Sequence, residues 1–85
     1  MKLVIVKMES GKYLFQVPED RNIKAGSMLM LNTSRGRQIG IAMCDSYVAE
    51  GDALEAIYKA FNTYESKMKF VIGAYEPRNW GEKDG

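Results

Sequence analysis

The sequence predicts a small, mainly-β protein whose strands curl into a barrel, with a single helix in its second half. Three observations support this prediction. Four apolar segments of strand length lie in the first half of the chain and are separated by turn residues. The hydrophobic period changes from two to about 3.6 only once, after Ala49. The 85 residues, 46% of them hydrophobic, suit one compact domain.

The first hairpin is predicted over residues 2–17. Residues 2–8 are rich in leucine, valine and isoleucine, and residues 12–17 alternate apolar with polar side chains. Residues 9–11, Glu-Ser-Gly, supply the turn between the two strands.

A second hairpin follows a polar connection. Residues 27–33 predict a third strand and residues 38–45 a fourth, in which Ile39, Ile41 and Met43 share one side. Gly36, in the turn between these strands, can adopt the positive φ that a tight hairpin turn needs.

A helix is predicted over residues 52–62, with Asp52 as its N-cap. The apolar side chains of this segment follow the spacing of one buried helical stripe, formed by Leu54, Ile57, Tyr58 and Phe61. Residues 68–75 alternate again and predict a fifth strand. The domain is therefore expected to span residues 1–76, with a C-terminal tail at residues 77–85.

The element order is therefore β-β-β-β-α-β. Five short strands in an open sheet would expose two edges, so we expect a small barrel in which the last strand lies beside the first. An SH3-like barrel fits this order better than an OB-fold, whose helix usually lies between strands three and four. Gly26, Gly40 and Gly73 are expected at the bends of the barrel. The predicted core consists of Val4, Val6, Phe15, Leu29, Leu31, Ile41, Leu54, Ile57, Phe61 and Phe70.

The stretch from Ile23 to Ala42 combines Gly26, a hydrophobic strand, a polar turn with Gly36, and a strand that contains Gly40. This stretch resembles the hairpin of many SH3-like and KOW-type barrels. The chain as a whole resembles small uncharacterised proteins of Firmicutes and their phages or mobile elements. The resemblance implies binding to a nucleic acid or a protein, and it carries no catalytic residue across.

The composition argues against several functions. Histidine is absent and Cys44 is the only cysteine, so the sequence offers no intramolecular disulfide, no cysteine-rich metal site and no histidine base. We therefore expect no enzymatic activity, no cofactor and no metal. The longest apolar runs, such as Leu3 to Val6, have four residues, far short of the roughly 20 that a membrane-spanning helix needs. A cytoplasmic location is expected.

The net charge of +1 is unevenly distributed along the chain. Residues 1–44 hold seven Lys/Arg against three Asp/Glu, whereas residues 45–85 hold five against eight. Four basic residues follow one another with no acid between them, and they are candidates for binding a phosphate backbone or an acidic protein: Arg21, Lys24, Arg35 and Arg37. The two pairs flank the third strand, roughly 20 Å long at 3.3 Å per residue, so they are not expected to form one patch. The aromatic candidates for a surface site are Tyr47, Tyr75 and Trp80.

Two predicted strands carry more apolar residues than a one-sided sheet needs. Leu3 and Ile5 alternate with valines, and Met28 and Met30 alternate with leucines, so both faces of each strand are apolar. The helix can cover one such surface. A neighbouring subunit or a protein target is the expected cover for the other, and these four residues are therefore candidate interface residues.

These observations favour a non-enzymatic binding module that acts through protein–protein contact, as a homodimer or as an accessory or inhibitory protein of phage or mobile-element type. The alternative is a nucleic-acid-binding barrel that uses the basic loops. A net charge of +1 argues against it, because nucleic-acid-binding domains usually carry a strong basic excess. A third hypothesis is a small inhibitor whose acidic residues 45–55 mimic a phosphate backbone.

Overall fold

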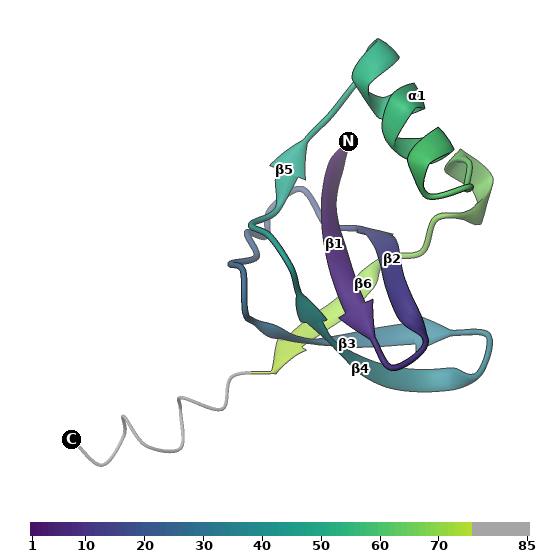
Figure 1. Ribbon diagram of the computed structural model, residues 1–85. Coiled ribbons are helices and arrows are strands. Elements are labelled where there is room, and N and C mark those ends of the chain that lie inside the picture. Colours follow the sequence, from purple (N-terminus) through teal and green to yellow (C-terminus); the bar gives the residue numbers. More distant parts are fainter. Residues whose placement is uncertain (76–85) are drawn as a thin grey trace.

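The computed structural model describes residues 1–75, which form a curled antiparallel sheet with one α-helix beside it (Figure 1). The elements in chain order are β1 (Lys2–Met8), β2 (Gly11–Gln16), β3 (Met28–Thr33), β4 (Gly36–Ala42), β5 (Tyr47–Val48), α1 (Gly51–Ala60), the 3-10 helix η1 (Glu65–Lys67) and β6 (Val71–Tyr75). The fold is small, mainly β and barrel-like, as the sequence predicts. The predicted tail at residues 77–85, which contains Trp80, lies outside the described residues.

The strands pair in the order β2-β1-β4-β3-β6, and the two-residue β5 pairs with the start of β1. All of these strand pairs are antiparallel. Figure 1 shows β1 and β2 crossing over the β3–β4 hairpin, so the sheet folds back on itself and encloses a core. Sequence reasoning missed β5, because two residues are too few to show a period.

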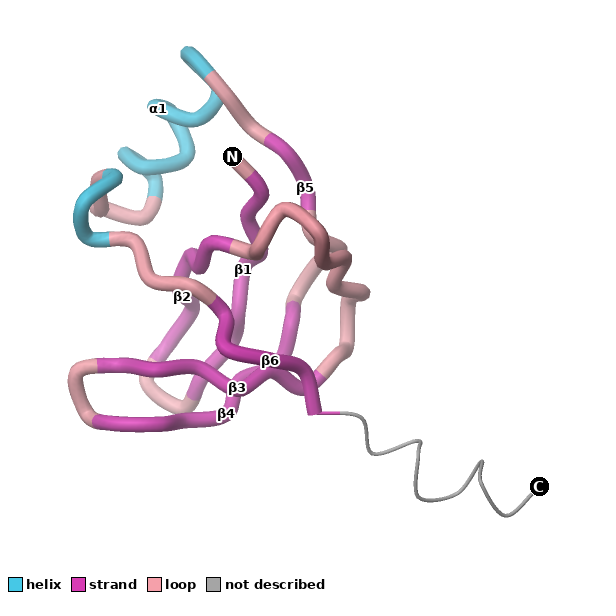
Figure 2. The backbone as a smooth tube through the Cα atoms, turned by 180° about the vertical axis from the view of Figure 1, so that it is seen from behind, coloured by secondary structure: helices cyan, strands magenta, loops and turns pink. Residues whose placement is uncertain are grey.

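The last strand does not lie beside the first, and this prediction is wrong. β6 pairs with β3 instead, and its approach makes one parallel bridge to the end of β2, between Phe70 and Gln16. The Gln16 amide also donates a hydrogen bond of 2.9 Å to the Lys69 carbonyl. The reason is that β1 has no free edge: β2 occupies one side, and β4 and β5 occupy the other. The chain therefore closes toward β2 (Figure 2).

The barrel core lies inside the curled sheet. Val4, Val6, Leu29 and Leu31 are fully buried there, as predicted, because they occupy the inward positions of β1 and β3. The other buried members of this cluster are Phe15, Val17, Ile23, Ala42 and Val71.

A second apolar cluster lies on the outside of the sheet, between α1 and the strands β1 and β2. Leu3, Leu14 and Tyr58 are buried there, and the predicted helical stripe of Leu54, Ile57 and Phe61 is partly buried against them. The helix starts at Gly51, after Glu50, and neither Glu50 nor Asp52 makes a side-chain cap hydrogen bond. The predicted N-cap is therefore wrong, and Asp52 contributes only a carboxylate in the first helical turn.

Two predicted core residues are exposed. Ile41 is 48% exposed because Gly40 and Ala42 take the inward positions of β4. Phe70 is 51% exposed because the register of β6 on β3 shifts between Met30 and Leu31. This bulge places Val71, rather than its neighbours, opposite Leu31 in the core.

Three glycines were predicted at bends where a side chain would clash. Only Gly40 has close neighbours in the position of a Cβ atom. Gly26 has open space around it but a φ of +90°, so it is needed for its backbone conformation. Gly73 has neither constraint. Gly36, with a φ of +99°, fills the predicted role in the β3–β4 turn.

Candidate functional site

The face of β3 and β4 that points away from the barrel core is apolar. Its central pairs are Met28 with Ile41 and Met30 with Ile39. The two isoleucines are 48% and 54% exposed, and the two methionines are partly exposed. We call these four side chains the outer face. Met43, two residues beyond Ile41 and 43% exposed, continues the alternation.

The outer face is apolar because the inward positions of β4 are occupied by small residues. Gly40 and Ala42 allow β4 to lie close to β1, and the larger Ile39 and Ile41, which alternate with them along the strand, must then point outward. On the other side, Met30 pairs with Gly73, which has no side chain to cover it. The alternation of small with large apolar residues in 39–43 is the sequence signal that could have identified this face.

The four predicted interface residues therefore separate into two groups. Met28 and Met30 belong to the outer face. Leu3 is fully buried and Ile5 is partly buried in the cluster beneath α1, so the helix covers this side of β1. The interface prediction is wrong for Leu3, which has no accessible surface to offer a partner.

The predicted basic residues do not form one patch. Arg21 and Lys24 lie in the β2–β3 connection, where the Lys2 ammonium group donates hydrogen bonds to the carbonyl oxygens of Glu19 and Arg21. Asp45 lies in the same region and accepts a hydrogen bond of 2.8 Å from the Ala25 amide. Arg35 and Arg37 lie at the other end of β3, in the β3–β4 turn and the start of β4.

Arg35 and Arg37 line a different feature, which sequence reasoning did not find. Two adjoining hollows, the first with a volume of about 490 Å³, share Met8, Ser10, Arg35 and Gln38. Together they form a groove between the β1–β2 turn, the β3–β4 turn and the segment that follows α1. We call it the basic groove, because its charged lining residues are Lys12, Arg35, Arg37, Lys67, Lys69 and one acid, Glu9.

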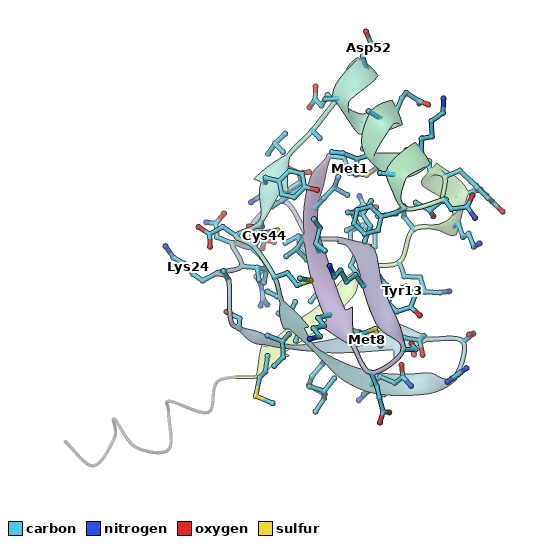
Figure 3. All side chains as sticks on the ribbon, in the orientation of Figure 1. Met1, Met8, Tyr13, Lys24, Cys44 and Asp52 are labelled. Atoms are coloured by element: carbon cyan, nitrogen blue, oxygen red, sulfur yellow. The ribbon has the colours of Figure 1, made fainter. Side chains whose placement is uncertain are left out.

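The aromatic candidates have different surroundings. Tyr47 is partly buried in the cluster beneath α1, and burial raises the pKa of its hydroxyl above the ordinary value, with a smaller effect from Cys44. Tyr75 ends β6, and Trp80 lies outside the described residues. The aromatic residues that line the groove are Tyr13, Phe15 and Phe61, and the two phenylalanines belong to the predicted core. Figure 3 shows Lys24 and Tyr13 at opposite edges of the view, with β1 between them.

Neither a metal centre nor a membrane-spanning helix occurs within residues 1–75. No three side chains of the types that bind metals come together in this part of the chain. Its one α-helix is too short and too polar to cross a membrane. Cys44 is partly buried against the barrel core.

No family model, curated protein or solved structure matches the chain significantly. The class of the protein therefore rests on its own fold and surface. The described residues form a small barrel-like β domain with a helix on one side, an exposed apolar face, and a groove lined mainly by basic residues.

Proposed function

We propose that the protein is a non-enzymatic binding module that acts through protein–protein contact, and that its partner at the outer face is a second copy of this chain. The observation that supports the proposal is the exposure of Ile39 and Ile41, side by side with Met28 and Met30 on one sheet face. Contiguous exposed apolar surface marks contact sites in soluble proteins.

The chemistry of the outer face suits the centre of an interface. Its four side chains carry no charge, and interface centres are depleted of charge and enriched in methionine. Methionine has three rotatable bonds and adapts to the shape of a partner. The nearest exposed charges lie at its margin, where Lys7 pairs with Ile41 and Arg37 pairs with Asn32.

A second copy is the partner that this face favours. In a two-fold symmetric contact the same patch is used by both chains, so one contact covers both apolar faces. Such a contact also adds buried area to a domain of 85 residues, whose own core is limited by its size. The non-enzymatic part of the proposal rests on the absence of histidine from the sequence and on the partial burial of Cys44 among apolar side chains.

The test is the molar mass of the protein in solution, measured by light scattering over a dilution series. A dimer predicts twice the chain mass of 9.6 kDa at high concentration and a fall toward 9.6 kDa on dilution. The double variant Ile39→Thr/Ile41→Thr should shift this transition to higher concentration. Threonine is also β-branched, so the strand preference of β4 is retained while apolar surface is lost.

Val48→Thr is the matched control, because Val48 is 62% exposed in β5 and lies outside the outer face. Its dimerisation should equal that of the unmodified chain, and circular dichroism checks that both variants are folded. An unmodified chain that stays at 9.6 kDa at every concentration refutes self-association. A dimer that both variants leave unchanged refutes the outer face as its interface.

A further inference from the structure

We infer that the basic groove binds single-stranded nucleic acid, with phosphates contacting its lysine and arginine side chains and a base stacking on Tyr13. This inference goes beyond the proposed self-association and uses a different surface, which shares only Ile39 with the outer face. It also differs from the sequence-based alternative, because Arg21 and Lys24 play no part and Lys12, Lys67 and Lys69 take their place.

The groove concentrates positive charge from three separate segments. Lys12 comes from β2, Arg35 and Arg37 from the β3–β4 hairpin, and Lys67 and Lys69 from the segment between α1 and β6. Figures 1 and 2 show the β3–β4 turn and the segment that follows α1 on the same side of the molecule. The net charge of +1 conceals this concentration, because most acids lie elsewhere in the chain.

Carboxylates of the described residues do not neutralise these cations. Among residues 1–75 the one ion pair joins the Met1 backbone nitrogen to Glu50, and neither residue lines the groove. Lys67 instead lies over the ring of Tyr64, 5.8 Å from its centroid. Five cations beside the single acid Glu9 leave an unbalanced positive potential, which attracts a polyanion.

Tyr13 is held in position at the groove. Its hydroxyl makes a 2.8 Å hydrogen bond with the Ser10 hydroxyl, and its ring lies beside Gly11. The ring is nevertheless 41% exposed. A fixed and accessible ring loses little conformational freedom when a base stacks on it.

The β3–β4 turn that carries Arg35 is fixed as well. The Thr33 hydroxyl accepts a hydrogen bond from the Arg35 amide and donates one to the Gly36 carbonyl, at 3.1 and 2.9 Å. The backbone that carries Arg35 and the ring of Tyr13 are therefore both held by local hydrogen bonds. An accessible ring within a basic groove favours unpaired bases over a duplex, whose bases already stack on one another.

The experiment measures fluorescence anisotropy of labelled oligothymidylate and oligouridylate of about 12 nucleotides, within the range of single-strand site sizes. A salt titration gives the slope of log K against log salt concentration. The double variant Lys12→Ala/Lys69→Ala should reduce the magnitude of this slope by about 1.4, since each lost single-strand phosphate contact contributes about 0.7. Arg21→Ala/Lys24→Ala removes the same charge away from the groove and should leave the slope nearly unchanged.

A second pair of variants tests stacking. Tyr13→Leu should weaken binding about tenfold, a typical value for loss of one stacked base. Tyr47→Leu is the control, because Tyr47 packs in the cluster beneath α1 and does not line the groove; circular dichroism checks that both variants are folded. Ile41→Thr changes the outer face at a residue that does not line the groove, so this variant should bind the oligonucleotides normally, which separates the two sites.

Four results would overturn the inference. They are no binding of either oligonucleotide at low salt, equal losses from the two charge variants, equal or tighter binding of a duplex of the same length, and equal affinity for thymidine monophosphate. The second result would indicate attraction by net charge alone, and the fourth would indicate a site for a single phosphate.

Discussion

Gly40 of β4 lies directly against Val6 of β1, with no room for a Cβ atom between them. A Cβ atom at position 40 would also lie 3.1 Å from both the Leu31 Cδ1 atom and the Lys7 carbonyl oxygen. The absence of a side chain at this position therefore allows β1 and β4 to approach closely. It also explains why Ile39 and Ile41, on either side of Gly40, point outward to form half of the outer face.

Gly40→Ala is expected to destabilise the protein by about 1–3 kcal/mol, the usual cost of overpacking a close contact. Gly73→Ala is the matched control, because nothing lies within 4 Å of a Cβ atom built there and its φ is ordinary. The control should change the free energy of unfolding by less than about 0.5 kcal/mol. Urea denaturation of both variants measures the difference, and equal effects would mean that β1 and β4 are farther apart than described.

The second prediction compares two large apolar residues. Leu29 is fully buried in the barrel core, so Leu29→Ala should cost about 2–5 kcal/mol. Phe70 is 51% exposed, so Phe70→Ala should cost only about 0.8–1.5 kcal/mol, half of the transfer free energy for a fully buried side chain. The sequence pattern alone would give Phe70 the larger effect. Urea denaturation midpoints show which of the two variants, Leu29→Ala or Phe70→Ala, destabilises the protein more.

Strand positions could be predicted from the sequence because period-two alternation and turn residues identify them locally. Which face of a strand is inward depends on the partner strands, and this is where the prediction failed. In β4 the small residues Gly40 and Ala42 face the core. Ile41 was expected there because it is larger and more apolar, but it points outward. At β6 a register shift removes the simple alternation that had placed Phe70 in the core.

The two surface features differ in how far the sequence could predict them. Met28 and Met30 could be identified, because a strand that is apolar on both faces must expose or cover one of them. The basic groove could not, because Lys12, Arg35 and Lys69 come from segments that meet only when the chain folds. Separation along the sequence conceals such a cluster.

The third prediction concerns the β3–β4 turn. Arg35 and Arg37 are exposed and form no ion pair with another described residue. Arg35→Ala/Arg37→Ala should therefore change the free energy of unfolding by less than about 0.5 kcal/mol. Thermal and urea denaturation test this at neutral pH. A larger loss would show that the guanidinium groups stabilise the fold, and the double variant would then be unsuitable for binding experiments.

The last prediction concerns stability at alkaline pH. Tyr58 belongs to α1, and its side chain is buried between this helix and the sheet. Its hydroxyl donates a weak hydrogen bond to the Met1 sulfur at 3.3 Å. Burial raises the pKa of this hydroxyl above its ordinary value, and the carboxylates of Glu65 and Glu55 raise it further. In the unfolded chain the pKa is about 10. The stabilising contribution is therefore fully present below about pH 10 and is lost as the pH rises through the higher folded-state pKa.

Tyr58→Phe removes the ionisable group and keeps the ring in the cluster, so the variant should lose less stability than the unmodified chain when the pH rises from about 8 to about 11. Tyr47, whose pKa is also raised by burial, leaves the variant some alkaline sensitivity. Tyr64→Phe is the control at an exposed position and should follow the unmodified chain. The measurement is the free energy of unfolding in urea at several pH values. Parallel curves for Tyr58→Phe and the unmodified chain would contradict the prediction, because they would mean that Tyr58 ionises equally readily in the folded and unfolded states.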